Sequence, residues 1–369
     1  MMDTSLDIIN SVISCQPKTT IKMKILNWVS PFCLNIILST FLIAQIDNPS
    51  LTLVSSSFLY EEAPFKECHA SSIVQVAEGK ILATWFGGTR EKNPDVTIWL
   101  SEYSQGKWGE IREVATGIQN DELRYPCWNP VLFKHSSGIL YLFYKVGPSP
   151  TTWWGESIQS KDNGKSWSKP DKIPDGFFGP IRAKPLEMAD GRIFCPSSLE
   201  IPNGKWSVHI EIFNPKDNSW KRIAVDDKSP YDIIQPTVLT HKEANTLQIL
   251  CRSRQNKIIE SWSYDGGNTW SKTAETTLPN PSAGVDAVSI PGKGHFLIYN
   301  PTVKGPNDRA KLAIAFSKDG KNWDSKIQLE DETSGEFSYP AMILGTDGQL
   351  KVTYTWKRRK IRFAELKIN

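Results

Sequence analysis

The sequence lacks the residue clusters that would indicate a metal site or nucleic-acid binding. Its six cysteines include no C-x-x-C pair, and those beyond residue 44 lie more than fifty residues apart. Structural zinc sites use closely spaced ligands, so no metal site is predicted. Lys and Arg are scattered among Asp and Glu, and the formal net charge of +3 is close to neutral. Without a basic block, nucleic acid is not an expected partner.

The cysteines also give no clear disulfide framework. Four of them, Cys68, Cys127, Cys195 and Cys251, stand in apolar runs of strand character. An exported chain can form disulfides, but these surroundings favour buried free thiols. The sequence contains no feature that supports an organic cofactor, so none is predicted.

Long apolar runs are missing except for one near the N-terminus. Two lysines flank Met23, and the apolar run that follows ends near Ala44. This is the order of a secretory signal peptide. We expect residues 1–44 to be an N-terminal extension with a signal peptide, residues 45–369 to be the mature domain, and the product to be secreted or periplasmic, with no stable membrane span after cleavage. The alternative is an uncleaved N-terminal membrane anchor, although Pro31 interrupts the run.

A short turn motif, S-x-D-x-G-x-x-W, recurs along the chain. It appears as "SKDNGKSW" at 160–167, as "SYDGGNTW" at 263–270 and in contracted form as "SKDGKNW" at 317–323. Degenerate copies end at Trp108 and Trp220, so the five motif tryptophans are spaced by 59, 53, 50 and 53 residues. Such a period indicates a repeat architecture. The motif itself is interpreted as structural, because Asp accepts backbone N–H bonds, Gly adopts positive φ and Trp packs between strands.

Each repeat contains short runs of alternating apolar and polar residues, such as "GKILATWF", "NTLQILCRS" and "GQLKVTYTW". These runs have the period of β-strands, and turn residues bound them. Four short strands per repeat, arranged around an axis, form a propeller blade. Five marked turns, with a last blade shared between the two ends of the domain, predict an all-β, six-bladed β-propeller. Asp162 and Asp265 are expected on its outer rim.

With this motif and period, the chain resembles the sialidase (neuraminidase) superfamily, specifically its sialidase-like BNR-repeat proteins, in which the turn is called the Asp box. The resemblance covers about residues 60–366. Asp boxes identify a fold rather than an activity. In sialidases, arginines grip the substrate carboxylate with paired hydrogen bonds. A tyrosine paired with a glutamate is the nucleophile, and an aspartate is the general acid and base.

Several residues match the positions of this machinery. The resemblance implies that Arg252, in "ILCRSR", and Arg309, in "GPNDRAKL", bind the carboxylate. It implies that Tyr339, in "EFSYPAM", is the nucleophile. In "GTREKNPDV", Asp95 occupies the acid loop, and Arg90 precedes it much as a family arginine does.

Two positions depart from the family pattern. Where the first carboxylate-binding arginine is expected, "ECHASSIV" places His69 nearest. The glutamate expected about seventeen residues before Arg252 is replaced by Gln235, in "IIQPTVL". A glutamine cannot accept the tyrosine's proton as a carboxylate can. We therefore expect the chemistry to depend on His69 together with Tyr339, with Asp95 as the alternative acid.

Other candidates have structural alternatives. Arg182 and Lys184, in "IRAKPLEM", are either extra anion contacts or charges between blades. Trp128, Trp153 and Trp154 lie in Pro- and Gly-rich loops and serve either as sugar-stacking platforms or in packing between blades.

The matched residues have such alternatives too. Arg252 can be a solvated charge at a strand edge, His69 a structural histidine with satisfied hydrogen bonds, and Asp95 a turn cap.

Three functions remain open. The preferred one is an exo-acting glycoside hydrolase that removes a terminal acidic sugar, sialic acid by family default. The second is a lyase or unusual glycosidase on uronic-acid glycans that uses His69 and Tyr339. The third is a non-catalytic carbohydrate-binding propeller. The retained arginines, Asp95 and Tyr339 favour an enzyme, while Gln235 and His69 favour a substrate other than ordinary sialic acid. The expected partner is thus an acidic glycan, and the oligomeric state stays open.

Overall fold

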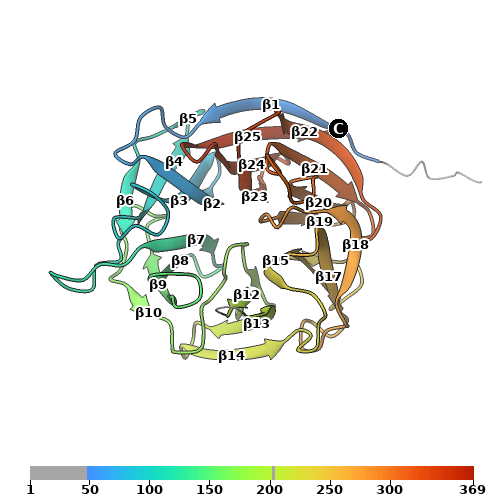
Figure 1. The fold of residues 1–369 in the computed structure, drawn as a ribbon, viewed down its shortest axis with the longest axis horizontal. Coiled ribbons are helices and arrows are strands. Elements are labelled where there is room, and N and C mark those ends of the chain that lie inside the picture. Colours follow the sequence, from blue (N-terminus) through green and yellow to red (C-terminus); the bar gives the residue numbers. More distant parts are fainter. Residues whose placement is uncertain (1–47, 202–203) are drawn as a thin grey trace, which may run out of the picture. The chain divides into compact units, whose positions relative to one another are not determined.

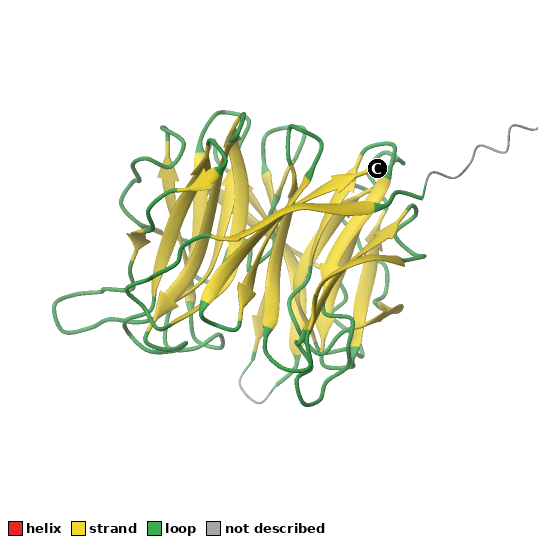
Figure 2. Ribbon diagram, turned by 90° about the horizontal axis from the view of Figure 1, so that it is seen from above, coloured by secondary structure: helices red, strands yellow, loops and turns green. Residues whose placement is uncertain are grey.

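A computed structural model describes residues 48–201 and 204–369 of the chain. The predicted N-terminal extension and signal peptide lie outside the described residues. Within the described part, no helix is long and apolar enough to cross a membrane. Figure 2 shows the described chain as strands joined by loops and turns.

The strands form six sheets arranged around a central axis, which confirms the predicted six-bladed β-propeller (Figure 1). The first blade contains β2 (Glu67–Ala77), β3 (Lys80–Gly88), β4 (Thr97–Ser104), β5 (Lys107–Trp108) and β6 (Arg112–Ala115). The second contains β7 (Cys127–Lys134), β8 (Leu140–Val146), β9 (Trp154–Ser160) and β10 (Asp171–Lys172). The third contains β11 (Leu186–Glu187), β12 (Ile193–Glu200), β13 (Trp206–Asn214) and β14 (Ser219–Ala224).

The second half of the chain builds the other three blades. The fourth contains β15 (Ile233–Thr240), β16 (Leu247–Ser253), β17 (Lys257–Ser263) and β18 (Ala274–Pro279). The fifth contains β19 (Asp286–Ile290), β20 (Gly294–Tyr299), β21 (Lys311–Ser317) and β22 (Asp324–Asp331). The sixth contains β23 (Phe337–Leu344), β24 (Leu350–Trp356), β25 (Lys360–Ile368) and, from the start of the domain, β1 (Leu51–Phe58).

The ring is closed within the sixth blade, as predicted. Strand β1 pairs antiparallel with β25, with Leu51 opposite Ile368 and Phe58 opposite Arg362. A backbone hydrogen bond of 3.0 Å from Asn369 to Ser50 continues this pairing to the end of the chain. The sheet at the closure therefore depends on residues from both ends of the domain.

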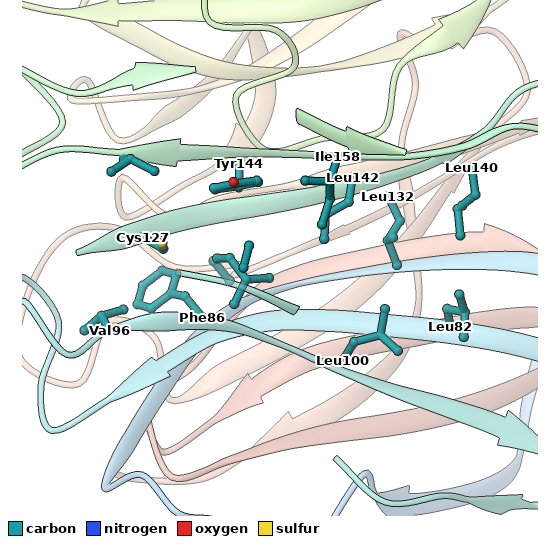
Figure 3. Packing of buried hydrophobic residues seen from close by; sticks show 14 of the residues in the cluster. Leu82, Phe86, Val96, Leu100, Cys127, Leu132, Leu140, Leu142, Tyr144 and Ile158 are labelled. Atoms are coloured by element: carbon teal, nitrogen blue, oxygen red, sulfur yellow. The ribbon is translucent and has the colours of Figure 1, made fainter. Parts of the chain in front are cut away.

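The hydrophobic core lies between neighbouring blades. Six clusters of buried side chains each draw their residues from two adjacent blades, so every interface between blades has its own cluster. Figure 3 shows the cluster between the first two blades, in which Leu82 and Leu100 face Leu132 and Leu140. The four cysteines of the domain are buried and free, as predicted.

The Asp boxes lie in turns that join the third and fourth strands of their blades, on the outer rim. The Asp265 carboxylate accepts the Thr269 hydroxyl at 2.6 Å and the backbone N–H groups of Asn268 and Thr269. These hydrogen bonds, led by those from Thr269, lower the pKa of Asp265 to about 2. Asp162 is likewise exposed and hydrogen-bonded within its own turn. The five motif tryptophans are half-buried, and each packs against a different interblade cluster.

The glycine at the fifth position of the Asp box is required by the preceding blade. Gly267 has φ +90°, and a Cβ atom there would lie 2.5 Å from Phe194 of the third blade. In the second blade, a Cβ on Gly164 would lie 2.5 Å from Leu82 of the first. Only a residue without a side chain allows the turn to approach its neighbour this closely.

Replacing Gly267 with alanine is expected to lower the free energy of unfolding by about 3 kcal/mol, since positive φ and overlap with Phe194 both oppose it. Gly348→Ala is the matched control, because Gly348 has φ +75° with no atom within 4 Å of its Cβ position. The control is expected to lose about 1–2 kcal/mol. Urea unfolding of both variants provides the measurement. Equal losses would show that contact with the preceding blade is not the constraint.

Lys145, on β8, is a fully buried cation. Its Nζ donates a hydrogen bond of 2.5 Å to the carbonyl of Pro180. Burial lowers the pKa of Lys145 to about 7, although Glu211 acts in the opposite direction. In the unfolded chain the same group keeps a pKa of about 10.4, so between these values the unfolded state binds the additional proton.

This difference makes the stability depend on pH. Between pH 7 and about 10, the contribution of Lys145 raises the free energy of unfolding as the pH rises. In this range the unfolded state binds more protons than the folded state, so a lower proton concentration favours the folded state. The Lys145→Met variant is expected to have a flatter profile over pH 7 to 9, measured by urea unfolding. Exposed Lys161→Met serves as the control and should follow the wild-type profile. Parallel profiles for wild type and Lys145→Met would contradict the assignment.

Candidate functional site

The innermost strands of four blades contain a bulge at the same place. The pairing register breaks around Ala70, Asn129, Gln235 and Tyr339, each of which has positive φ. A bulge re-aims the side chain of the extra residue. The sequence therefore presents a different side chain at equivalent positions of four blades.

Arg252 connects two of these bulges. It ends an apolar stretch of β16 and is 8% exposed. Its Nη1 donates to the Tyr339 hydroxyl at 2.6 Å and to Gln235 Oε1 at 3.2 Å, while Nη2 donates to Ser282 Oγ at 3.2 Å. Gln235 and Tyr339 are thus neighbours through one guanidinium, as the resemblance implied for the tyrosine and its partner.

Three guanidinium groups surround the Tyr339 ring. The Cζ atoms of Arg182, Arg252 and Arg309 lie 5.6, 5.8 and 5.9 Å from its centroid. They come from the third, fourth and fifth blades, and Tyr339 comes from the sixth. The predicted convergence of Arg252 and Arg309 is therefore present, with Arg182 as a third member.

Arg182 is the most deeply placed of the three. It is 3% exposed and donates to the backbone carbonyls of Pro340, at 2.8 Å, and Val285. Its Nε and that of Arg252 are buried without a hydrogen-bond partner among the described residues. Buried, unsatisfied donors are rare in proteins, and here they belong to cations.

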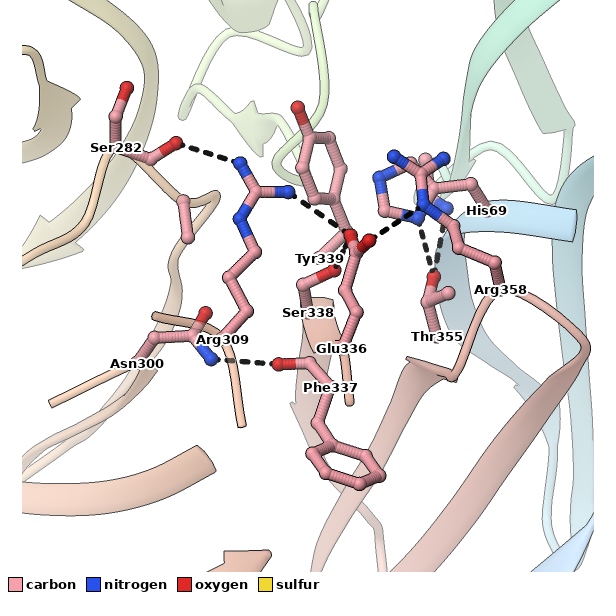
Figure 4. A network of polar contacts seen from close by, with 12 residues as sticks. His69, Ser282, Asn300, Arg309, Glu336, Phe337, Ser338, Tyr339, Thr355 and Arg358 are labelled. Carbon is pink, nitrogen blue, oxygen red and sulfur yellow. Dashed lines mark hydrogen bonds and ion pairs between the residues drawn. The ribbon is translucent and has the colours of Figure 1, made fainter. Parts of the chain in front are cut away.

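A chain of alternating charges leads away from Tyr339. Arg309 Nη1 lies 3.1 Å from Glu336, and Arg358 Nε lies 3.0 Å from the same carboxylate (Figure 4). Arg358 Nη1 then lies 2.6 Å from Glu91. Burial alone would raise the pKa of Glu336, but Arg358 and Arg309 hold this pKa below its usual value. Glu336 therefore remains a carboxylate between two guanidinium groups.

His69 packs directly on the tyrosine. Its ring centroid lies 4.1 Å from that of Tyr339, and Nδ1 is 3.0 Å from Thr355 Oγ1. Burial lowers the pKa of His69 well below 6.5, and the positive charges of Arg358 and Arg309 lower it further. His69 thus stands beside the predicted nucleophile as expected. It differs from the expectation in being a neutral imidazole, not a group that titrates near pH 7.

Arg90 lies in a cavity next to this cluster. The cavity has a volume of about 570 Å³ and is lined by Glu67, Arg90, Glu91, Lys92, Asn93 and Arg358. Tyr339 is not among its lining residues. The connection is Arg358, which lines the cavity with one side and contacts Glu336 with the other.

Asp95 and Lys184 are held in hydrogen-bonded positions. Asp95 is exposed, and its Oδ2 accepts the Thr89 N–H at 2.8 Å and the Thr89 hydroxyl at 2.6 Å. This is the geometry of a turn cap, on the same loop as the cavity residues 90–93. Lys184 Nζ contacts both oxygens of Asp286, at 3.0 and 2.9 Å, so the structure places it in an ion pair between blades.

The tryptophans predicted as possible platforms lie in packing positions. Trp128 and Trp153 are 2% and 8% exposed and belong to one buried cluster with Ile181. Trp154 is half-buried and donates to Glu156 at 2.9 Å. The packing interpretation accounts for Trp128 and Trp153.

Sequence reasoning missed four residues near the cluster. Arg358 and Glu336 form the charge chain, and Trp206 lies under two guanidinium groups, with Arg252 Cζ 5.2 Å and Arg254 Cζ 4.0 Å from its ring centroid. Opposite Trp206 on the paired strand stands Glu200. Burial raises the pKa of Glu200, while Arg252 and Arg254 oppose the shift.

The sequence marks the bulges of the site, but not the four residues that were missed. Proline follows the bulge residue in "NPVL", "QPTV" and "YPAM", which marks three of the four bulges in the sequence. Arg358 carries no such mark, because Glu91, one of its two ion-pair partners, comes from the other end of the domain. Within the described ranges, no group of three or more His, Cys, Asp or Glu residues is placed to hold a metal ion.

Comparison with known proteins assigns the family. A family model described as a BNR repeat-like domain matches residues 79–352. The chain therefore belongs to the BNR repeat-like family, which confirms the predicted place in the sialidase-like superfamily. No curated protein matches the chain.

Solved structures share the fold at low sequence identity. A protein of unknown function from Dyadobacter fermentans is 16% identical, with a TM-score of 0.71, over 87% of this chain and 100% of that one. The Hadza microbial sialidase Hz136 is 16% identical, with a TM-score of 0.67, over 81% of this chain and 65% of its own length. A variant of the NanB sialidase from Streptococcus pneumoniae is 11% identical, with a TM-score of 0.65, over 87% and 71%. At these identities the likeness shows the fold alone.

The state of His69 can be tested directly. At pH 6 its imidazole is expected to remain neutral in the folded protein, because burial and four arginines oppose a further positive charge. Nitrogen-15 NMR of the ring, assigned by loss of the signals in His69→Gln, provides the measurement. An imidazolium signal from His69 at pH 6 would contradict this electrostatic description. In the unfolded chain the imidazole of His69 is protonated near pH 6.5. As the pH falls below that value, the unfolded state binds a proton that the folded state does not, so His69 lowers the free energy of unfolding.

Proposed function

We propose that the protein is an exported glycoside hydrolase that removes a terminal acidic sugar from a glycan, with sialic acid as the family's default. The observation that carries the proposal is the convergence of Arg182, Arg252 and Arg309 on Tyr339, whose oxygen accepts a 2.6 Å hydrogen bond from Arg252. Export rests on the lysine-flanked apolar run that ends near Ala44. The sialidase structures of the same fold support the proposal at the level of the family.

Arg252 and Arg309 are assigned to the substrate carboxylate. Both donate to Ser282. Arg252 donates to the Ser282 hydroxyl at 3.2 Å and Arg309 donates to the Ser282 backbone carbonyl at 3.1 Å, so the two guanidinium groups lie around one residue. Neutral acceptors such as Ser282 Oγ are weak partners for a cation compared with a carboxylate. A bound carboxylate replaces them and adds a second anion to the cluster besides Glu336, which pairs with Arg309 but not with Arg252 or Arg182. Arg182 remains tied to backbone carbonyls and contributes positive field.

Tyr339 is assigned as the nucleophile. Its oxygen attacks the anomeric carbon, the bond from that carbon to the leaving oxygen breaks, and a proton from the general acid passes to the leaving oxygen. Arg252 stabilises negative charge on the phenol oxygen as it attacks. His69, neutral in the free protein, receives the phenol proton in place of the missing glutamate once the bound carboxylate offsets the positive field that opposes its protonation. Asp95 is assigned as the acid, since Thr89 fixes its Oδ2 and leaves Oδ1 without a partner among the described residues.

The proposal predicts that Arg252→Lys lowers kcat/KM for the acidic sugar about 100-fold, because lysine keeps the charge and loses the two-pronged geometry. Arg254→Lys is the matched control: it lies two residues further on, its side chain is 46% exposed, and it should stay within about twofold of wild type. Release of sugar from sialosides and from uronic-acid oligosaccharides, read by mass spectrometry, gives the rates. Unchanged kinetics in folded Arg252→Lys would remove Arg252 from the site.

A second candidate is favoured by His69 and Gln235. Gln235 stands in place of a glutamate, and the ring centroids of His69 and Tyr339 lie 4.1 Å apart. His69 and Tyr339 therefore also suit elimination from a uronic-acid glycan. A base removes the proton at C5, the bond from C4 to its oxygen breaks, and Tyr339 gives a proton to the leaving oxygen. A C4–C5 double bond results, and no water is added.

The same assay distinguishes the candidates. Hydrolysis adds one water to the products, whereas elimination gives a product lighter by one water with ultraviolet absorbance. His69→Ala should abolish turnover and preserve binding in either case. Normal turnover by His69→Ala would show that His69 does not receive the phenol proton, and binding without any turnover by wild type would identify a carbohydrate-binding propeller.

A further inference from the structure

The cavity beside the charge chain has three walls from different parts of the chain. Glu67 stands at the start of β2, residues 90–93 form the loop after β3, and Arg358 lies in the turn between β24 and β25. Its volume of about 570 Å³ falls within the range of about 300–1,000 Å³ found for ligand pockets. The proposed catalytic function uses none of its residues except, indirectly, Arg358.

The walls are fixed in place by hydrogen bonds. The N–H of Asn93 donates to the carbonyl of Arg90 at 3.0 Å, and that of Val96 donates to Asn93 at 3.0 Å. The Asp95 carboxylate caps the loop by accepting the Thr89 N–H, as described above. On the opposite side, the N–H of Cys68 donates to the carbonyl of Arg358 at 2.8 Å. The cavity is therefore largely preformed.

The charges in the cavity do not balance. Arg358 is neutralised by Glu91, at 2.6 Å, and by Glu336 on the far side. Arg90 and Lys92 are exposed and have no ion-pair partner among the described residues. Two free cations therefore face one remaining carboxylate, Glu67. A ligand that suits this set carries a negative group for Arg90 and Lys92 and hydroxyl donors for Glu67.

An acidic sugar has both kinds of group. A carboxylate or sulfate ester pairs with the guanidinium of Arg90, and sugar hydroxyls donate to Glu67 and bond with the amide of Asn93. Neutral sugars leave the two cations without a partner. The lining thus selects against an uncharged saccharide.

The cavity adjoins the Tyr339 cluster through shared ion pairs. Arg358 contacts Glu336 at 3.0 Å, and Glu336 contacts Arg309 at 3.1 Å, so a single carboxylate separates the cavity's guanidinium from one assigned to the first acidic sugar. We propose that this cavity is a second subsite for a further acidic sugar of the same chain, so that the substrate is an oligosaccharide with at least two acidic residues. This inference rests on the function proposed for the Tyr339 cluster.

The test uses two pairs of oligosaccharides. One pair is a glycan that ends in two linked sialic acids and its derivative methyl-esterified at the second residue, and the other is the corresponding pair built on glucuronic acid. Wild type is expected to bind the member with two free acids at least tenfold more tightly, by isothermal titration calorimetry, and to show a similar ratio in kcat/KM. The double variant Arg90→Ala with Lys92→Ala should lose this preference, so that the acid and the ester have similar affinities and similar kcat/KM.

A matched double variant controls for overall charge. Lys161→Ala with Lys165→Ala removes the same charge from an exposed Asp-box turn on the outer rim and should retain the wild-type preference. Equal affinity of wild type for acid and ester in both pairs would overturn the subsite, even if turnover is normal. An absence of turnover, with binding that still depends on Arg90 and Lys92, would instead count against the proposed hydrolysis and leave the subsite standing.

Discussion

The pairing of β1 with β25 determines what the ring can bring together. Because the first strand of the domain completes the last blade, the first and sixth blades become neighbours around the axis. This neighbourhood places His69 against Tyr339 and Thr355, and places the backbone of Arg358 against Cys68. The site is therefore a product of closure. The residues that the first and sixth blades contribute to the site are far apart in the sequence and meet only in the completed ring.

The centre of the ring concentrates like charges at an energetic cost. Three buried or half-buried guanidinium groups around one phenol repel each other, and burial takes them out of water. Glu336 offsets part of this cost by bridging Arg309 and Arg358. Cation–π attraction between the guanidinium groups and the aromatic ring of Tyr339 offsets a further part. The net result is a positive electrostatic field around the Tyr339 ring, which favours the binding of an anion.

The sequence revealed the fold because its signal is local and repeated. The motif from Ser263 to Trp270 forms a turn from its own hydrogen bonds, and the spacing of its copies fixes the size of a blade. The matched site residues Arg252, Arg309 and Tyr339 could be located because each follows or begins a recognisable strand. Arg358 could not, because its partner Glu91 comes from the first blade and only closure brings the two together, while Glu336 belongs to the same blade as Arg358. The neutral state of His69 likewise depends on burial and on four arginines contributed by other blades.

The four bulges on the innermost strands differ in how far they take part in the packing between blades. At equivalent positions they carry Ala70, Asn129, Gln235 and Tyr339; Ala70 belongs to the cluster between the first two blades and Tyr339 packs against it, whereas Asn129 and Gln235 are in none of the interblade clusters. Mutation at position 129 or 235 can therefore alter the side chain at a bulge without removing a member of these clusters. Gln235, which stands where the family resemblance implies a glutamate, occupies such a position, so the substitution changes the chemistry offered beside Tyr339 while the packing between blades stays the same.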